Sequence, residues 1–395
     1  MRRRLPRWAF YQIFPNTEDN MKILLAGGGT GGHFYPIVAV VRALKKIAEE
    51  EAFINMELTY FSDQPFDANM LREEGVRFVS VSAGKMRRYF SFLNFIDFFK
   101  TILGIFQAII AIYADMPDVV FAKGAYASFP ALLAARLFRI PVIIHESDIA
   151  PGFVNSWAAK FAKRIAISFP ESIKYFPESK TALVGNPVRS RILGGNLNEA
   201  REIFGIDSAP VILALGGSQG AQKINNVILD ILPDMLSEAV IIHQCGPKNL
   251  DSVSKQSLVI LEKNEFKDRY RLYGFINEDD LRSASCAASL IISRAGAGAI
   301  FEIAAWGKPS ILIPIADSPQ DHQRQNAYNY ARTGAAAVIE ENNLAPHILI
   351  AEIKKILSDK TRQISMNKAA AAFAKIDAAE KIARQIVDLA LEHAL

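Results

Sequence analysis

The sequence predicts an α/β protein of two doubly wound, Rossmann-like domains that face a central cleft. The chain has 395 residues, more than a single core usually holds. From Met21 onward, short apolar strands alternate with amphipathic helical segments, which is typical of a parallel sheet with helices on both faces. A strand that runs into glycines and then into a helix begins the same scheme again at Pro210. Two such sheets would place a ligand between their carboxyl ends.

The first unit begins at Met21, where MKILLAGGG predicts a short buried strand and the segment 36–50 has helical spacing. The later strands of this unit are predicted at 57–61, 77–81, 118–121, 141–145 and 164–168. In the second unit, the strand of PVILALGGSQG is followed by a predicted helix at 224–236. Its later strands are predicted at 240–244, 271–274, 290–293, 310–314 and 337–339.

The boundary between the units falls near GNPVR, because Pro187 restrains the residue before it and interrupts regular structure. We therefore expect a first domain at 21–188 and a second at 189–375. Residues 376–395 form a closing helix with no strand after it, which we expect to pack back on the first domain. Residues 1–20 are expected to be a disordered extension, since their arginines precede too short an apolar stretch for a signal peptide. Weak attraction of these arginines to an anionic membrane is the alternative.

Composition and charge exclude several classes of protein. Half of the residues are hydrophobic and 22% are charged, so disordered and low-complexity classes are excluded. The net charge of +4 is too small to imply nucleic acid as a partner. The two cysteines, Cys245 and Cys286, lie far apart and outside any CxxC, so neither a disulfide framework nor a zinc site is predicted.

A strongly apolar segment at 91–116 raises the question of a membrane. Its charge-free part, 101–114, is shorter than the roughly 20 residues that span a bilayer, so we expect no span. Lys85, Arg87 and Arg88 precede several phenylalanines, a combination expected of a surface that lies among lipid headgroups. The region 85–99 is therefore predicted to bind an anionic membrane surface, and an ordinary core helix is the alternative.

The first glycine loop, from Gly27 to His33, follows a strand and opens a helix. Its backbone can approach a ligand closely, and the helix N-terminus favours negative charge. The loop also satisfies GxGxxG, but a dinucleotide site needs an acidic residue roughly 20 residues further on. Asp63 lies about thirty residues past Gly32, which weakens that alternative. His33 lies at the tip of the loop, where we expect a catalytic imidazole.

Three later segments offer further ligand contacts. GGSQGA, from Gly216 to Ala221, repeats the strand-to-helix geometry and can hold a second anion. SRAGAG follows another strand, and Glu302 behind it can accept two hydrogen bonds from a ribose diol. The polar loop after the next strand carries Asp321, His322, Gln323 and Asn326. No DxD motif accompanies it, so no metal is implied, and helix dipoles with Arg189 would balance a diphosphate.

In this order and spacing, the motifs resemble the MurG family of glycosyltransferase family 28. They are GGGTGGHFYP, KGAYASFP, IPVIIHESDIAPGFVN, GNPVR, GGSQGA and the series RAGAG, FEIAAWGKP and DHQRQNA, and they cover nearly everything from Met21 to Ala336. The resemblance implies a GT-B fold and an inverting transfer of N-acetylglucosamine from UDP-N-acetylglucosamine to the muramyl 4-hydroxyl of an undecaprenyl-linked acceptor. It implies a peripheral position on the cytoplasmic face of the cell membrane, and no cofactor is expected.

The resemblance also implies a role for each matched residue. His33 is the candidate general base, and a histidine with a pKa near neutrality suits the deprotonation of an acceptor hydroxyl. The donor contacts are Arg189 and Ser218 at the diphosphate, Ile276 at the uracil, Glu302 at the ribose, and Gln323 and Asn326 at the sugar hydroxyls. The donor loops also include Gln219, Gly220, Gly298 and Ala299. The loops at the acceptor diphosphate comprise Thr30, Gly31, Gly32, Tyr126, Ser128, His145 and Asp148.

The sequence departs from the family's usual pattern at three places. The second loop reads GAYASFP where GGYVSGP is usual, so glycines that allow close backbone approach are lost. Asp148 brings a negative charge where an amide is usual. Gly298 and Ala299 replace a Leu-Thr pair, which leaves Glu302 with more of the ribose contact.

Other functions fit parts of the pattern. A UDP-N-acetylglucosamine epimerase would use the same scaffold without lipid contact or an acceptor cleft, and the apolar, basic segment argues against it. A nicotinamide-dependent dehydrogenase would explain GxGxxG but leaves GGSQGA and DHQRQNA without a role. A GT-B transferase that acts on another lipid, such as diacylglycerol, is a close variant of the leading function.

Overall fold

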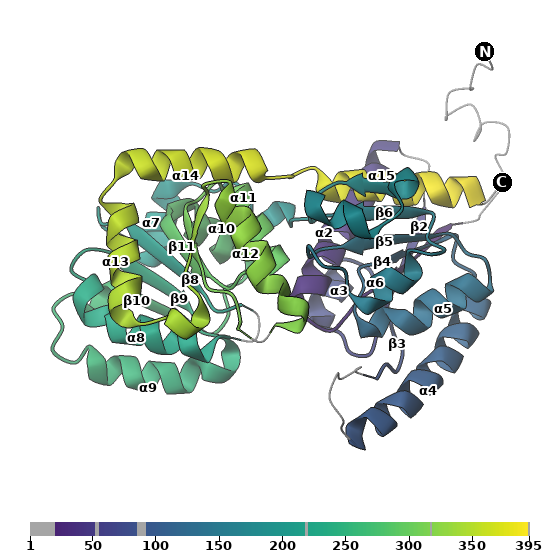
Figure 1. Ribbon diagram of the computed structural model, residues 1–395, viewed down its shortest axis with the longest axis horizontal. Helices are drawn as coiled ribbons and strands as arrows, with labels where there is room; N and C mark the ends of the chain where they lie inside the picture. Colours follow the sequence, from purple (N-terminus) through teal and green to yellow (C-terminus); the bar gives the residue numbers. More distant parts are fainter. Residues whose placement is uncertain (1–19, 52–54, 85–91, 218–219, 317, 394–395) are drawn as a thin grey trace, which may run out of the picture.

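The computed structural model describes residues 20–51, 55–84, 92–217, 220–316 and 318–393, and it contains two parallel sheets that lie side by side with helices around each (Figure 1). All of the predicted extension 1–20 except Asn20 lies outside the described residues. The two α/β units therefore form as the alternating pattern predicts.

The first sheet is parallel throughout, in the order β3-β2-β1-β4-β5-β6-β7. Its strands are β1 (Met21–Ala26), β2 (Met56–Ser62), β3 (Arg77–Ser80), β4 (Val119–Ala122), β5 (Val142–Glu146), β6 (Arg164–Ile167) and β7 (Thr181–Leu183). The sequence predicts all of these except β7. That strand has three residues at the edge of the sheet and two of them are exposed, so it lacks the buried apolar run that marks the others.

Among the described residues, five helices between the strands of the first sheet lie around it. They are α2 (Gly31–Glu51), α3 (Ala68–Glu73), α4 (Phe92–Asp115), α5 (Phe129–Leu137) and α6 (Phe153–Ala158). The first of them starts five residues before the predicted helix at 36–50, because the helix begins inside the glycine loop and contains Pro36. This early start places His33 in the first helical turn.

The second sheet is also parallel, in the order β10-β9-β8-β11-β12-β13. Its strands are β8 (Val211–Leu215), β9 (Val240–Gln244), β10 (Tyr270–Tyr273), β11 (Ala288–Ser293), β12 (Ser310–Leu312) and β13 (Ala336–Val338). Its helices are α7 (Leu197–Phe204), α8 (Gln222–Met235), α9 (Leu250–Ile260), α10 (Glu278–Ala287), α11 (Ala297–Trp306), α12 (His322–Arg332), α13 (Pro346–Leu357) and α14 (Lys360–Phe373). Every strand predicted from the sequence is present within two residues of its expected bounds.

The last helix, α15 (Ala378–His393), returns to the first domain and lies along α2 (Figure 1). Its buried side chains, among them Ile382 and Ile386, join the core beneath α2 together with Val40. The chain therefore begins and ends on the same domain.

The two sheets share an arrangement that directs their loops toward each other. β1 lies between β2 and β4, as β8 lies between β9 and β11. An apolar contact joins the domains, where the ring of Phe169 packs edge-on against Phe301 with centroids 5.4 Å apart. Both rings are fully buried in one core cluster. The loops at the carboxyl ends of the strands meet across this junction.

Candidate active site

His33 lies in the first turn of α2, directly after the first glycine loop. Its Nδ1 atom is 2.9 Å from the hydroxyl of Thr30, and its backbone N–H donates to the Thr30 carbonyl. Gly31 is buried, whereas Gly32 is exposed with open space where a side chain would be. Among the described residues Nε2 has no hydrogen-bond partner. The ring is therefore held at one nitrogen and can accept a proton at the other.

Charged or titratable groups from three other elements act on His33. Lys123 follows β4, Asp148 follows β5, and His322 opens α12 of the second domain. Burial, and then the ammonium of Lys123, lower the pKa of His33 from 6.5 to about 4, while the carboxylate of Asp148 opposes the change. The imidazole is thus neutral at physiological pH, with a pKa lower than the near-neutral value expected from the sequence.

The loop after β4 presses against the first glycine loop. Ala125 adopts φ 66° and ψ 164°, a region that is essentially open only to glycine. A side chain at Gly28 would come within 2.7 Å of the Ala125 methyl group. Ser128 is buried, and its hydroxyl is 2.8 Å from the carbonyl oxygens of both Gly124 and Ala125. Ser128 therefore holds the backbone of this loop from below.

Tyr126 and Asp63 form a second link between loops of the first sheet. The tyrosine hydroxyl donates to Asp63 Oδ2 at 2.8 Å. Burial and this carboxylate raise the pKa of Tyr126. Because Asp63 is engaged by Tyr126, it is not an unoccupied ribose ligand of the kind that a dinucleotide site requires.

A buried polar cluster lies beneath these loops, centred on Lys123, which the sequence analysis does not single out. The Lys123 side chain is almost completely buried, with Nζ 2.7 Å from His145 Nδ1, 3.0 Å from Asn186 Oδ1 and in contact with the Ser147 hydroxyl. His145 Nε2 is 2.9 Å from the Gly185 carbonyl oxygen. His145 thus lies inside the domain with both nitrogens engaged. The sequence feature that indicates this cluster is a lysine at the end of the apolar run VVFAK.

Asp148 and Asn326 meet across the junction of the domains. The Asn326 amide donates to Asp148 Oδ1 at 2.7 Å, and its carbonyl oxygen accepts from the backbone N–H of Ile149 at 3.2 Å. Asn326 is fully buried. One residue predicted on the acceptor side therefore contacts one predicted on the donor side.

Arg189 and Glu302 form an ion pair, and Arg189 packs on α2. Arg189 is 4% exposed, and its Nη2 is 2.8 Å from Glu302 Oε1. The guanidinium lies 3.8 Å from the ring centroid of Tyr35, two residues after His33 on α2. Arg189, predicted at the diphosphate, therefore contacts α2 through Tyr35, and residues two apart on a helix do not face the same side.

A further ion-pair network crosses between the domains. Arg42 on α2 contacts both oxygens of Glu278, at 3.0 and 2.8 Å, and its Nε is 2.7 Å from Glu74. Arg189 Nη1 is 3.4 Å from the same Glu278 carboxylate. Sequence reasoning misses this network, because its members lie far apart in the chain.

The second glycine loop, after β8, is tightly packed. Ser218 and Gln219, both predicted at the donor, lie outside the described residues. Gly220 has φ 80°, and a side chain there would come within 2.2 Å of Asn249 Nδ2, so only glycine fits. Gln244 at the end of β9 links this loop to Ile276: its amide donates to the Gly217 carbonyl at 3.4 Å and accepts from the Ile276 N–H at 3.1 Å. The predicted uracil segment is thus held by Gln244, which the sequence analysis does not identify.

The other predicted donor residues lie on the same edge of the second sheet. Gly298 and Ala299 are in the first turn of α11 and partly exposed, with open space beside Gly298. The Gln323 side-chain oxygen accepts from the Ile315 N–H at 3.2 Å. Among the described residues no group of three or more His, Cys, Asp and Glu side chains could hold a metal ion.

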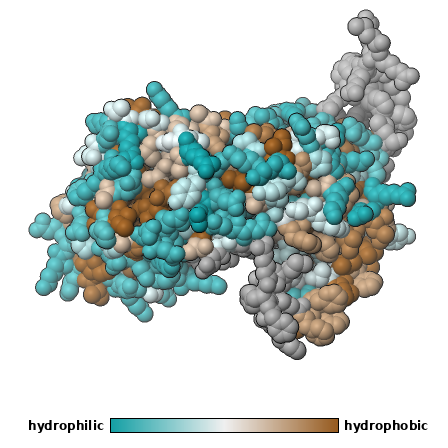
Figure 2. All heavy atoms as spheres, in the orientation of Figure 1, coloured by the Kyte–Doolittle hydropathy of each residue, from teal (hydrophilic) through white to brown (hydrophobic). Residues whose placement is uncertain are grey.

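Helix α4 presents an apolar face at the surface. Phe95, Phe98 and Phe106 are each about 60% exposed. Figure 2 shows hydrophobic residues gathered at the lower right, where Figure 1 places α4. The opposite side of the helix packs in the core through Ala108 and Ile112, both fully buried. One side of this helix is therefore core and the other is an exposed apolar surface.

The length and composition of this helix would permit a membrane span. Over Phe95–Asp115 its mean hydropathy reaches 1.9, with 17% of the most apolar window buried. It is the one helix of this kind in the described parts of the chain. Lys85, Arg87 and Arg88, which are predicted to accompany it at the membrane, lie outside the described residues.

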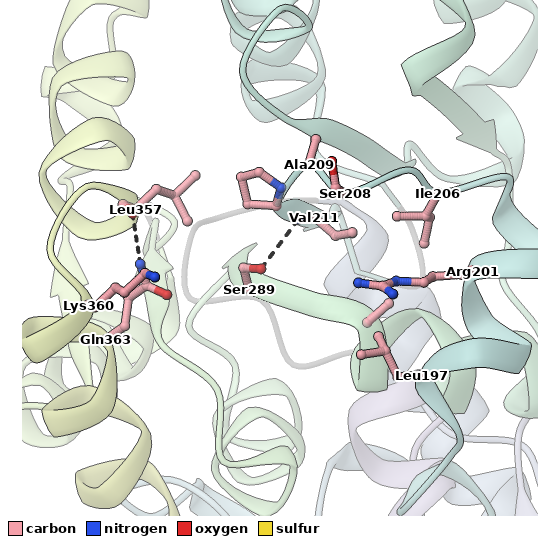
Figure 3. Close-up of a pocket in the computed structure, with 12 residues that line it drawn as sticks. Leu197, Arg201, Ile206, Ser208, Ala209, Val211, Ser289, Leu357, Lys360 and Gln363 are labelled. Atoms are coloured by element: carbon pink, nitrogen blue, oxygen red, sulfur yellow. Dashed lines mark hydrogen bonds between the residues drawn. The ribbon is translucent and has the colours of Figure 1, made fainter.

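A hollow of about 380 Å³ lies at the amino-terminal ends of the strands of the second sheet, between α7 and α14 (Figure 3). It is lined by Val211 and Ser289 near the starts of their strands, and by Arg201 and Lys360 from the flanking helices. The glycine loops lie at the carboxyl ends of these strands. The hollow is therefore separate from the cleft.

Two family descriptions match most of the chain. The glycosyltransferase family 28 N-terminal domain matches residues 23–167, and the glycosyltransferase family 28 C-terminal domain matches residues 211–382. A protein of Clostridium botulinum is 37% identical over 348 residues, which are 87% of this chain and 93% of the relative. A protein of Clostridium novyi is 35% identical over 354 residues, or 89% of this chain and 94% of the relative. Both are named UDP-N-acetylglucosamine–N-acetylmuramyl-(pentapeptide) pyrophosphoryl-undecaprenol N-acetylglucosamine transferase.

Solved structures share the fold at lower identity. MurG of Acinetobacter baumannii has a TM-score of 0.69 and 24% identity, with 93% of this chain and 99% of that chain covered. A protein of Listeria monocytogenes named "putative UDP-N-acetylglucosamine 2-epimerase" has a TM-score of 0.68 and 14% identity, with 92% of this chain and 95% of that chain covered. Transferases and epimerases thus share this architecture, and the fold alone does not distinguish them.

Proposed function

The chain belongs to glycosyltransferase family 28, and from this membership we infer that it transfers N-acetylglucosamine from UDP-N-acetylglucosamine to the 4-hydroxyl of undecaprenyl-pyrophosphoryl-N-acetylmuramyl-peptide. This step converts lipid I to lipid II in peptidoglycan synthesis. The observation that supports the proposal is the position of His33 at the junction of the two domains, where Asp148, which acts on His33, is hydrogen-bonded to Asn326 of the second domain. We propose that residues 21–188 bind the acceptor and 189–375 bind the donor.

His33 acts as the general base of this transfer. An inverting displacement at the anomeric carbon requires removal of a proton from the attacking hydroxyl. We assign the imidazole proton to Nδ1, which donates it to the Thr30 hydroxyl, so that Nε2 is free to accept the proton of the acceptor hydroxyl. With a pKa of about 4, the imidazole is already unprotonated when the substrates bind. It is a weaker base than free histidine, and its catalytic advantage is that it is held in place and is already unprotonated.

The departing UDP carries the negative charge that develops in the transition state. Arg189 supplies positive charge, and the N-termini of α2 and α11 direct backbone N–H groups toward the cleft. Arg189 is paired with Glu302. Donor binding replaces this pair, so that Glu302 accepts from the ribose and Arg189 contacts the diphosphate.

The remaining donor contacts come from the second domain. Ile276 reads the uracil from a backbone segment that Gln244 holds. Gln323 reads the hydroxyls of N-acetylglucosamine, and Asn326, which is fully buried, holds Asp148 and Ile149 of the first domain against the donor side. The loops of Thr30, Tyr126 and Asp148 hold the acceptor diphosphate, with His145 and Ser128 supporting them from inside the domain.

We also propose that the enzyme is a peripheral protein of the cytoplasmic membrane face and that the exposed side of α4 enters the headgroup region. Burial of apolar area contributes about 25 cal/mol per Å², and each basic side chain near an anionic surface about 1 kcal/mol. The phenylalanines of α4 and the predicted basic cluster at 85–88 supply both contributions. This placement would bring the cleft to the lipid-linked acceptor.

Vesicle binding tests the membrane proposal. The chain is expected to cosediment with phosphatidylglycerol-containing vesicles at low salt and to dissociate partly as salt rises, because screening weakens only the charged contribution. Replacing both Phe98 and Phe106 by Ser should remove most of the binding and leave UDP affinity unchanged. Leu258→Ser, which changes a side chain that is 70% exposed on the second domain, is the matched control and should bind as the parent does. Equal binding by all three proteins would place the lipid surface elsewhere.

The activity is tested with UDP-N-acetylglucosamine radiolabelled in the sugar and a short-chain analogue of lipid I. The proposal expects labelled disaccharide lipid and one UDP released per transfer. Conversion of UDP-N-acetylglucosamine to its 2-epimer without an acceptor would establish the epimerase instead. Transfer to diacylglycerol in preference to the muramyl lipid would establish a different acceptor.

A further inference from the structure

Lys123 is a buried cation to which the proposed mechanism gives no part. It follows β4 directly, with 1% of its surface exposed, and its backbone N–H donates to the Ala26 carbonyl at 2.8 Å. A side chain at Gly27 would lie 3.7 Å from Lys123 Cβ, so its stem passes beside the start of the loop that carries His33. Burying an ammonium is costly unless its hydrogen bonds are all made.

The hydrogen bonds around Nζ identify its protonation state. The Gly185 carbonyl can only accept, so His145 Nε2 carries the proton and His145 Nδ1 is an acceptor. The Ser147 hydroxyl donates to Asn186 Oδ1 at 3.5 Å and therefore accepts from the lysine. The Asn186 oxygen accepts as well. Three acceptors thus surround Nζ, which matches the three protons of the charged ammonium.

The three partners of this ammonium belong to different parts of the site. His145 lies in β5, and Ser147 directly precedes Asp148 in the loop after that strand. Asn186 lies in the linker between the domains, three residues before Arg189. One buried group therefore ties together an acceptor loop and the segment that leads to the donor contact.

We propose that Lys123 is a positioning residue for the transfer: its ammonium holds the Asp148 loop and the linker to Arg189 in one arrangement beside His33. The inference rests on the proposed function, in which His33 is the base. It assigns to Lys123 no contact with substrate, because the side chain is buried below the cleft surface.

The charge of Lys123 also remains without a directly bonded carboxylate among the described residues. Glu146 and Asp148 attract it from a distance, while the Glu146 carboxylate accepts hydrogen bonds from Asn155 Nδ2 at 2.9 Å and from the Gly152 N–H at 3.1 Å. Burial lowers the pKa of Lys123 and raises that of Glu146. The positive charge is therefore only partly compensated locally.

Lys123 is one of three side chains that act on the pKa of His33. Lys123 and His322 lower its pKa, and Asp148 raises it. Asp63 lies next to Gly29 of the loop that carries His33, and its carboxylate accepts a hydrogen bond from the Tyr126 hydroxyl. Removal of the lysine charge would leave the field of Asp148 less opposed, and the pKa of His33 would rise.

The test compares pH profiles of kcat/KM for transfer to the lipid I analogue by the full chain and its variants. In each profile, kcat/KM falls at low pH as His33 becomes protonated, and we call this fall the acid limb. Lys123→Met should move the acid limb to higher pH by roughly half to one unit, since a positive charge near the base is lost. Asp148→Asn should move it downward. Ser147→Ala removes one partner of Nζ but keeps the charge, so the limb should stay in place while kcat/KM falls. A purely structural lysine would lower all rates without moving the limb.

The outcomes separate this inference from the proposed function. A parent protein without transfer activity contradicts the function itself. An active parent whose acid limb is the same in Lys123→Met, with a native-like thermal melt, overturns the role of Lys123. If Lys123→Met does not fold, Lys123→Gln keeps donors for the same acceptors without the charge, and the same upward shift is expected of it.

Discussion

The two sheets place a cation at the same position and give it different partners. Lys123 directly follows β4, the neighbour of β1, and Arg294 directly follows β11, the neighbour of β8. Arg294 pairs with the carboxylate of Glu341 and donates to the Ile313 carbonyl at 3.2 Å. Lys123 donates instead to three uncharged acceptors.

The difference shows how one position can serve the fold in one domain and the chemistry in the other. A cation in contact with a carboxylate is neutralised locally, and its pair stabilises the surrounding loops. A cation among neutral acceptors keeps a field that reaches nearby titratable groups through a medium of low polarity. We therefore assign a structural role to Arg294 and an influence on the base to Lys123.

The largest effect is expected at the base that the first domain carries. His33→Ala should lower kcat by 10²- to 10⁴-fold, the usual cost of removing a general base, while UDP affinity changes little. Steady-state transfer rates and isothermal titration with UDP measure the two quantities. A variant with the turnover of the parent would reject His33 as the base.

The second expected effect concerns stability in the other domain. Arg294→Met leaves the partly buried Glu341 carboxylate with the Ala316 N–H at 3.2 Å and Lys223 at 3.5 Å, and should lower the free energy of unfolding by roughly 2 to 3 kcal/mol. Denaturant unfolding measures this. The acid limb of the rate should stay where the parent has it. An acid limb that is shifted in Arg294→Met would show that Arg294 also influences the base, and would contradict the difference between Arg294 and Lys123.

A smaller effect is expected at the donor edge. Glu302→Ala removes a ribose contact that is made equally in the ground and transition states, so the donor KM should rise about tenfold and kcat should fall less. Steady-state kinetics with varied UDP-N-acetylglucosamine measures both. A loss confined to kcat would assign Glu302 to the chemical step instead.

The smallest effect concerns the backbone of the equivalent loops. The loop after β4 holds Ala125 in a glycine-like conformation, whereas Gly296 after β11 has an ordinary φ of −65°. Ala125→Gly should therefore stabilise the protein by about 1 kcal/mol, because backbone strain at such positions costs of order 1–3 kcal/mol. The control Ala127→Gly, at a buried position without positive φ, should destabilise it. Melting temperatures that move in the same direction for both variants would contradict the strain at Ala125.

Much of the fold could be predicted from periodicity and glycine placement. The predicted family and GT-B fold class are confirmed by the family matches and by the structural likeness to MurG. The strand β7 could not be predicted, because a three-residue edge strand buries too little apolar surface to leave a pattern. The early start of α2 was missed because glycines and Pro36 conceal a helix that tertiary packing stabilises.

The site was predictable where a motif lies in one loop and not where distant segments meet. His33, Arg189 and Glu302 could be named from motifs, and the structure pairs Arg189 with Glu302. The pairing of Arg42 with Glu278 could not be predicted, because it depends on how the domains meet. Lys123 was overlooked because the sequence does not show that three polar partners surround its ammonium.

The central claim is that a neutral His33 at the domain junction is the base of the sugar transfer. The pH dependence of kcat/KM for transfer from UDP-N-acetylglucosamine to the lipid I analogue tests it most directly. Because the pKa of His33 is lowered to about 4, the rate should stay level from neutral pH down to about pH 5, fall only below that as the imidazole becomes protonated, and show no such limb in His33→Ala. A limb centred near the ordinary histidine value of 6.5, or one that persists in His33→Ala, would contradict the account.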